Sequence, residues 1–241
     1  MSQDRTIVII PTFDNPLTIK DVAFDILKYN YKLIIVDDGS KTPVEELFSP
    51  EERENIVFLR HETNQGKGQA IITGTQKAKE MGYTHVVSMD GDGQHLASQI
   101  ATLTRDYQED EIVIGARNFD IDNIPFGSKI GRWFSNFWAC WDTGYTITDS
   151  LSGFRVYPVS ILDLPIKTKR FDWEMEVLVR HADDGKSIRE VEIECHYPLE
   201  EERVSHFRNF EDTMSIVWVH VQILPLKWPG MLWHKLLPGK Q

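Results

Sequence analysis

Residues 84–94 read THVVSMDGDGQ, a short apolar run that stops at two aspartates separated by glycine. Thr84–Met89 is typical of a buried strand, and the glycines that follow predict a turn. Such a turn could aim the oxygens of Asp90, Asp92 and Gln94 at one point. Two carboxylates and an amide oxygen suit a divalent cation, Mg²⁺ or Mn²⁺, that keeps water or phosphate ligands. A simple polar turn is the alternative.

Alternating strand and helix patterns surround this stretch and predict a mostly parallel sheet covered by helices on both faces. In the first half we expect strands at Arg5–Ile10, Lys32–Val36, Asn55–Leu59 and Glu111–Ile114, and helices starting at Asn15-Pro16 and covering Gly66–Lys79 and Leu96–Tyr107. In the second half we expect helices at Ser128–Trp141, Asp172–Asp184 and Thr213–Leu226, and strands at Gly153–Tyr157 and Ser187–Cys195. With no linker between the halves, residues 1–241 are predicted to form one α/β domain, with its core at about 5–210.

Composition excludes several classes of protein. The 26 Lys and Arg against 37 Asp and Glu give a formal charge of −11, which argues against a nucleic-acid binder. Two cysteines are too few for a disulfide scaffold and indicate a reduced, cytoplasmic protein. As a helix, Thr213–Leu226 would span roughly 21 Å, which is short of a bilayer core of about 30 Å. Residues 211–241 are therefore predicted to form a C-terminal helix and tail that do not span a membrane, with the helix either packed on the core or lying at a membrane interface.

Other polar motifs follow the predicted strands, at the edge where parallel sheets bind ligands. Pro11 and Thr12 end the first strand. Asp37 and Asp38 follow the second, where one could contact a ribose or base while the other caps a helix; both could equally be turn residues. Lys67, between two glycines at a helix start, is a candidate anion contact.

The second half adds three further signals. Asp149 and Arg155 flank a flexible turn, where they could bind substrate or form a structural salt bridge. Ser128–Trp141 combines aromatic residues with cations, which suits a bilayer interface but also a core helix. Arg203–Arg208 is a basic segment that could close over a diphosphate, or pair with Glu200–Glu202 instead.

Taken in order, these motifs resemble those of family 2 glycosyltransferases. The similarity is greatest to dolichol- and polyprenol-phosphate mannosyltransferases and their short soluble bacterial relatives. The motifs are Pro11-Thr12-Phe13, Val36–Ser40, Asn64–Gly68, Asp90–His95, Ile114–Arg117 and Ser152–Arg155. The chain departs from the family pattern at two places. The first motif continues with Asp14-Asn15, where Asn-Glu is usual, and the closing segment has Ser205-His206, where Ser-Lys is usual.

The resemblance implies a GT-A (Rossmann-like) fold, a nucleotide-diphospho-sugar donor, a divalent cation and inversion at the anomeric carbon. It also implies the following roles: Pro11 and Phe13 line the base pocket and Asp37 contacts the nucleoside; Asp90, Asp92 and Gln94 hold the metal; Arg117 and Arg132 lie near the acceptor phosphate; Arg203 and His206 close on the diphosphate.

We therefore expect a metal-dependent inverting glycosyltransferase that moves a hexose from a GDP- or UDP-sugar to a lipid-linked acceptor such as polyprenyl phosphate. A phosphate acceptor needs no general base, whereas a hydroxyl acceptor in lipid or surface-glycan assembly would need one, with Asp149 as the candidate. The remaining alternatives are a nucleotidyltransferase and a non-catalytic nucleotide-sugar or membrane-docking module. We expect peripheral contact with the inner face of the cytoplasmic membrane and no nucleic-acid partner, and homo-oligomerisation stays open.

Overall fold

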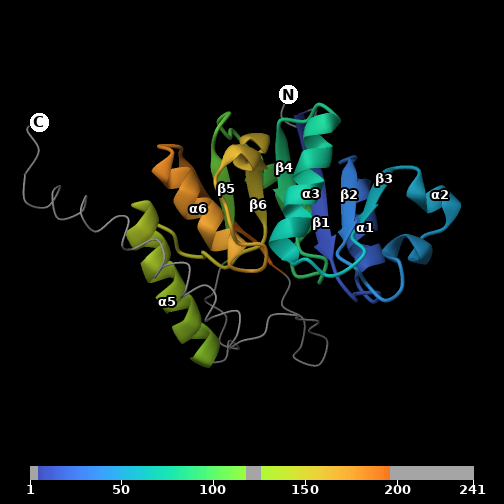
Figure 1. Cartoon of the computed structure of the whole chain (residues 1–241), viewed down its shortest axis with the longest axis horizontal. Coiled ribbons are helices and arrows are strands. Elements are labelled where there is room, and N and C mark those ends of the chain that lie inside the picture. Colours follow the sequence, from blue (N-terminus) through green and yellow to red (C-terminus); the bar gives the residue numbers. More distant parts are fainter. Residues whose placement is uncertain (1–4, 118–125, 196–241) are drawn as a thin grey trace, which may run out of the picture.

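The computed structural model describes residues 5–117 and 126–195, and within them the strands form one seven-stranded sheet (Figure 1). The strands are β1 (Thr6–Thr12), β2 (Leu33–Asp37), β3 (Ile56–Arg60), β4 (His85–Ser88), β5 (Ile112–Arg117), β6 (Arg155–Pro158) and β7 (Ile188–Ile193). Their order across the sheet is β3-β2-β1-β4-β6-β5-β7. β6 runs antiparallel to both of its neighbours, and the other pairs are parallel, so the prediction of a mostly parallel sheet is confirmed.

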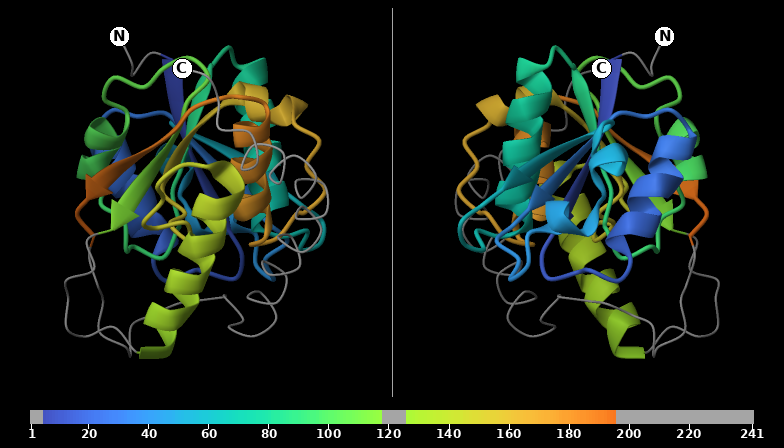
Figure 2. Two further views of the ribbon diagram at one scale, coloured as in Figure 1. Left: turned by 90° about the vertical axis from the view of Figure 1, so that its left-hand side faces the viewer. Right: turned by 90° about the vertical axis from the view of Figure 1, so that its right-hand side faces the viewer.

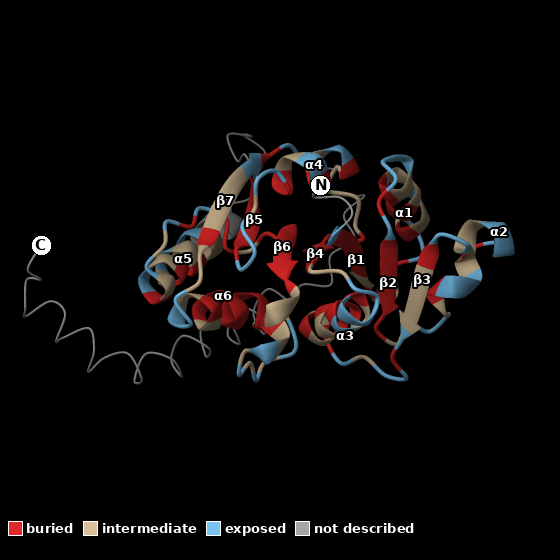
Figure 3. Cartoon of the chain, turned by 90° about the horizontal axis from the view of Figure 1, so that it is seen from above, coloured by how far each residue is buried: buried red, intermediate tan, exposed pale blue. Residues whose placement is uncertain are grey.

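Helices cover both faces of the sheet (Figure 3). They are α1 (Ile19–Lys28), α2 (Pro50–Arg53), α3 (Lys67–Glu80), α4 (Ile100–Leu103), α5 (Phe126–Thr143) and α6 (Trp173–Asp183). Short 3₁₀ turns add η2 (Val44–Leu47), η3 (Ala97–Gln99) and η4 (Val159–Asp163). α1 and α4 lie on one face, while α3, α5 and α6 lie on the other. Figure 2 shows α5 reaching well past the rest of this helical layer.

The alternation of side chains along β1 divides the core between the two faces. Val8 and Ile10 pack with the apolar residues of α1, whereas Ile7 and Ile9 pack with those of α3 and α6. All four are fully buried. A central strand buried on both faces needs apolar residues at consecutive positions, which is why this one reads as an unbroken β-branched run.

The reversed direction of β6 brings a further loop to the edge where β4 and β5 end. Arg155, the first residue of β6, lies opposite Ser88 of β4 and Ile114 of β5. The residues that precede Arg155 therefore join those that follow β4 and β5. This edge of the sheet collects most of the residues that the sequence analysis singled out.

Two expected helices differ from the prediction. α1 begins at Ile19, after a Thr18 N-cap, because Asn15 is not a helix cap: its side chain donates a hydrogen bond to the carbonyl of Gly91. The helix expected over Leu96–Tyr107 is only the 3₁₀ turn η3 followed by the single turn α4. Thr213–Leu226 and the predicted tail lie outside the described residues. In the part of the chain that is described, no helix has the length and apolarity to cross a membrane.

Candidate active site

The acidic turn after β4 is anchored by the segment that precedes α1. The carbonyl oxygen of Gly91 accepts hydrogen bonds from Asn15 Nδ2 at 2.7 Å and from Thr18 Oγ1 at 2.6 Å. Further along the turn, Asp92 Oδ1 accepts a hydrogen bond from the backbone N–H of Gln94 at 3.0 Å. These contacts fix the backbone of the turn between Asp90 and Asp92. Hydrogen bonds within the protein therefore determine the distance between the two aspartates.

Asp90 is the neutralised carboxylate of this turn. Lys67 Nζ, from the first turn of α3, lies 2.6 Å from Asp90 Oδ1 and 3.0 Å from Glu174 Oε1 of α6. A Cβ atom at Gly153 would overlap Asp90 Oδ2 and Lys67 Nζ, so any larger residue there would push the ends of both side chains aside. Burial opposes ionisation of Asp90, but the charges of Lys67 and His95 outweigh it and lower the pKa of Asp90.

The position of Lys67 differs from what the sequence suggested. Its ammonium group binds two carboxylates rather than facing an open anion site, and a contact with a donor diphosphate stays a prediction. Glu174 was not among the predicted site residues. A single acidic residue on an amphipathic helix gives no sequence signal of its own, and only the packing of α6 against α3 brings it to Lys67.

The carboxyl group of Asp92 ionises less readily than that of Asp90. Burial and, to a smaller extent, the neighbouring charge of Asp90 raise the pKa of Asp92 to about 6. A divalent cation would relieve both effects. Asp90, Asp92 and Gln94 could supply only oxygen ligands, a chemistry that suits Mg²⁺ or Mn²⁺, and a metal site at these three residues stays a prediction. Among the described residues no group of three or more acidic, His or Cys side chains could hold a metal. A cation here would therefore complete its coordination with water or with substrate oxygens.

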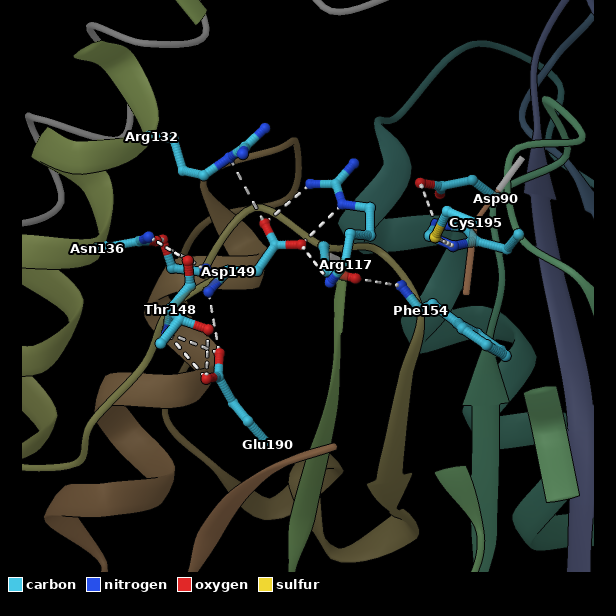
Figure 4. Close-up of polar contacts among 12 residues, drawn as sticks. Asp90, Arg117, Arg132, Asn136, Thr148, Asp149, Phe154, Glu190 and Cys195 are labelled. Atoms are coloured by element: carbon cyan, nitrogen blue, oxygen red, sulfur yellow. Dashed lines mark hydrogen bonds and ion pairs between the residues drawn. The ribbon is translucent and has the colours of Figure 1, made fainter. Parts of the chain in front are cut away.

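Two arginines surround a buried carboxylate next to the acidic turn (Figure 4). Arg117, at the end of β5, donates to Asp149 through Nε at 2.7 Å, through Nη2 at 2.9 Å and through its backbone N–H at 3.2 Å. Arg132 Nε, from α5, lies 4.0 Å from Asp149 Oδ1. Asp149 is only 1% exposed. Both of its oxygens are occupied by Arg117, so this geometry does not favour the general-base role, which stays a prediction.

Asp37 supports the loop after β2. Its carboxylate accepts hydrogen bonds from the backbone N–H groups of Ser40 at 2.8 Å and Val44 at 3.1 Å, and it pairs with Arg60 of β3. Its side chain is almost fully buried. The predicted contact between Asp37 and a nucleoside stays a prediction. To make it, the Asp37 carboxylate would have to bind the nucleoside in addition to its three partners within the protein.

Asp38 connects β2 to the start of α3. Its carboxylate accepts hydrogen bonds from the N–H groups of Gln65 at 2.9 Å and Gly66 at 2.7 Å, and it contacts His61 Nδ1 at 2.6 Å. One interpretation of the sequence was that an aspartate at this point caps the helix after β2, and Asp38 does not do so. Asp38 instead holds the loop that places Lys67 beside Asp90.

Arg155 is a structural residue, which corrects its prediction as a substrate contact. It is fully buried, and its guanidinium donates to the carbonyl oxygens of Ser150, Ser152 and Glu174, each at 2.7 Å. An arginine with three carbonyl partners inside the core is not placed to bind a ligand. It ties the loop before β6 to the start of α6.

The remaining predicted residues divide into two groups. Pro11 and Thr12 end β1, where Thr12 lies opposite Asp37 in the register, and Phe13 follows half-buried at the same edge. A base pocket at these residues stays a prediction. Arg203 and His206 lie outside the described residues.

An open, mostly parallel sheet with an Asp-Gly-Asp turn at its carboxyl edge is the arrangement of GT-A glycosyltransferases. Comparison with known sequences agrees, and the chain belongs to glycosyl transferase family 2, whose sequence profile matches residues 7–161. It is thus an enzyme of the glycosyltransferase class.

Among curated relatives, a UDP-N-acetylglucosamine–dolichyl-phosphate N-acetylglucosaminyltransferase of Methanococcus voltae is 31% identical over 220 residues, which cover 82% of this chain and 88% of the relative. An undecaprenyl-phosphate mannosyltransferase of Micrococcus luteus is 29% identical over 202 residues, covering 78% and 82%. Among solved structures, glucosyl-3-phosphoglycerate synthase of Mycobacterium tuberculosis, in complex with Mn²⁺, UDP and phosphoglyceric acid, has a TM-score of 0.65 at 14% identity and covers 90% of this chain and 77% of that one. This structural likeness confirms the fold.

Proposed function

We propose that this enzyme transfers a hexose from a UDP- or GDP-sugar to a polyprenyl phosphate, with inversion at the anomeric carbon. The observation that carries the proposal is the pair of arginines, Arg117 and Arg132, gathered by Asp149 near the acidic turn. Two cations at the edge of a site suit an anionic acceptor. The names of the relatives from Methanococcus voltae and Micrococcus luteus, which specify dolichyl and undecaprenyl phosphate acceptors, support the same class.

The chain supplies different residues to the two substrates. Asp90, Asp92 and Gln94 would hold a divalent cation, which when bound neutralises charge on the diphosphate leaving group. Arg117 and Arg132 orient the acceptor phosphate, an oxygen of which forms the new bond to the anomeric carbon as the bond to the donor diphosphate breaks. Because that phosphate is already an anion, no side chain has to remove a proton. The occupied carboxylate of Asp149 is consistent with such a reaction.

A donor and acceptor panel tests this proposal. Radiolabelled UDP- and GDP-sugars would be incubated with Mn²⁺ and either a polyprenyl phosphate or the corresponding polyprenol, and label in the organic phase would be counted. We expect transfer to the phosphate but not to the alcohol, and no transfer by Arg117→Ala. Transfer to the alcohol alone would refute the acceptor class and would require a base that this site does not present.

We further propose that α5 makes peripheral contact with a lipid bilayer. Trp133 and Phe137 of this helix are 68% and 46% exposed, and their rings stack at a centroid distance of 6.0 Å. Exposed aromatic residues on a helix whose sequence also carries Lys129 and Arg132 suit the interfacial region of a bilayer, where a lipid-linked acceptor is located.

Vesicle flotation without nucleotide tests the membrane contact. Wild-type protein should float with vesicles of phosphatidylcholine and phosphatidylglycerol, and the double variant Trp133→Ser/Phe137→Ser should not. Tyr29→Ser is the matched control, since Tyr29 is 44% exposed at the end of α1 on the opposite face of the sheet. Wild-type protein that stays unbound would contradict the membrane contact and favour a dimer surface on α5.

A further inference from the structure

Glu190 of β7 holds the backbone of the segment that carries Asp149. Its carboxylate accepts hydrogen bonds from the N–H of Thr148 at 2.9 Å, from Thr148 Oγ1 at 2.9 Å and from the N–H of Asp149 at 3.0 Å (Figure 4). Two consecutive backbone donors and a hydroxyl thus converge on one side chain. Hydrogen bonds to an ionised acceptor are stronger than those between neutral groups, so this contact fixes the segment more firmly than a neutral partner would.

The carboxylate of Asp149 continues the connection in the opposite direction. While its N–H group is held by Glu190, its side chain receives Nε and Nη2 of Arg117 and lies 4.0 Å from Nε of Arg132. In Figure 4, Glu190 lies on one side of Asp149 and the two arginines lie on the other. Asp149 thus links the backbone held by Glu190 to the guanidinium group of Arg117, and its carboxylate lies close to that of Arg132.

The sheet makes Glu190 a rigid support. β7 pairs with β5 along six residues, and Glu190 lies opposite Ile114, three residues before Arg117. The same pair of strands thus carries the supporting carboxylate and the first of the two arginines. Anchoring on regular strands keeps a site more precise than anchoring on a loop.

We propose that Glu190 is a positioning residue for the acceptor side of the site: by holding the Thr148–Asp149 backbone, it orients Arg117 and Arg132 toward the acceptor phosphate. This inference rests on the proposed function. The acidic turn has separate anchors in Asn15, Thr18 and Lys67, so the donor side does not depend on Glu190.

Kinetics of two Glu190 variants and a matched control test the inference. Glu190→Ala removes all of the acceptor oxygens, and Glu190→Gln keeps one while placing an NH₂ group against the remaining donors. We expect the KM for polyprenyl phosphate to rise about tenfold or more in Glu190→Ala and less in Glu190→Gln, with the KM for the nucleotide sugar unchanged. Glu194→Gln, an exposed glutamate directly after β7, is the matched control and should behave as wild type.

Hydrogen exchange adds a readout that does not depend on turnover. The amides of Thr148 and Asp149 should exchange faster in Glu190→Ala, while those of the acidic turn keep their wild-type rates. An unchanged acceptor KM in Glu190→Ala, an equal rise in both KM values or unchanged exchange at Thr148 would overturn the inference alone. Wild-type enzyme without transfer to any polyprenyl phosphate would overturn the proposed function, and this inference with it.

Discussion

Replacing Asp92 by Asn should inactivate the enzyme and yet stabilise its fold in the absence of a cation. Burial and the charge of Asp90 raise the pKa of Asp92 to about 6, whereas an unfolded aspartate titrates near 3.9. At 1.36 kcal/mol per pKa unit, the ionised carboxylate destabilises the folded state by up to about 3 kcal/mol. Asparagine keeps an oxygen for the N–H of Gln94 and removes the charge. For a chain of this size, the gain corresponds to a Tm increase of about 6–12 °C.

The sign of the pH dependence follows from the raised pKa. Below about pH 3.9 the carboxyl is protonated in both the folded and the unfolded state, so the substitution changes little. As the pH rises from about 3.9 to 6, the unfolded wild-type chain loses this proton while the folded chain keeps it, so the wild-type fold is progressively destabilised; above pH 6 the loss reaches its full size, and the variant shows none of it. The stabilising effect of Asp92→Asn should therefore be small at pH 4.5 and close to its full size at pH 8.

Thermal unfolding, with and without Mn²⁺, measures this effect. In EDTA at pH 8 the variant should unfold at a higher temperature than wild type. A cation at 100 times its Kd should stabilise wild type by about 2.7 kcal/mol and the variant much less. Asp163→Asn is the control, since Asp163 is exposed in η4, which follows β6 at the opposite edge of the sheet. A variant less stable than wild type in EDTA, or one that Mn²⁺ stabilises equally, would refute the reasoning.

Three further substitutions test other parts of the site. Gly153→Ala should reduce activity at least about tenfold and lower the Tm, because its Cβ would lie within 2.5 Å of Asp90 and Lys67; near-normal kinetics would show that this packing can relax. Arg155→Lys should destabilise the fold by about 3 kcal/mol or more in urea unfolding, since three buried carbonyls lose their partner, with both KM values unchanged. A raised KM without loss of stability would restore Arg155 as a substrate contact. Asp149→Asn should lower kcat/KM for the acceptor while leaving nucleotide affinity, measured by calorimetry, unaltered; a selective loss of nucleotide affinity would contradict its place on the acceptor side.

The strands could be predicted from the sequence because each is an apolar run between polar turns. The observed bounds of β2, Leu33–Asp37, lie within one residue of the expected ones, and β1 extends to Thr12 because Pro11 still pairs with Val36. Helix boundaries were less predictable. Asn15-Pro16 has the composition of a helix start, but the side chain of Asn15 binds Gly91, which is 76 residues away. Sequence pattern also gave no direction for β6.

Within the site, the acidic turn was predictable because glycine and aspartate after a strand form a local pattern. The partners of its residues were not. Lys67 meets Glu174 only after α3 and α6 have packed together, and Arg117 meets Asp149 only after β6 has returned to the sheet. Ion pairs between residues that are distant in the chain leave no local signal. The hydrogen bond from Arg155 to the carbonyl of Glu174 likewise forms only once β6 and α6 have packed together.

The reversed strand β6 has a consequence for how this family could diversify. The chain leaves the sheet at the end of β5 and re-enters it at the start of β6, and these two strands are hydrogen-bonded neighbours. The described part of the chain between these two strands, which includes α5, Arg132 and Asp149, is thus an insertion between neighbouring strands, here called the cassette. Recombination could replace that cassette without breaking the sheet, provided that the new segment keeps a glycine at position 153 against Asp90 and Lys67. Under the proposed function, a chimaera carrying the equivalent cassette of a relative should keep its sugar donor and acquire the lipid preference of the other parent.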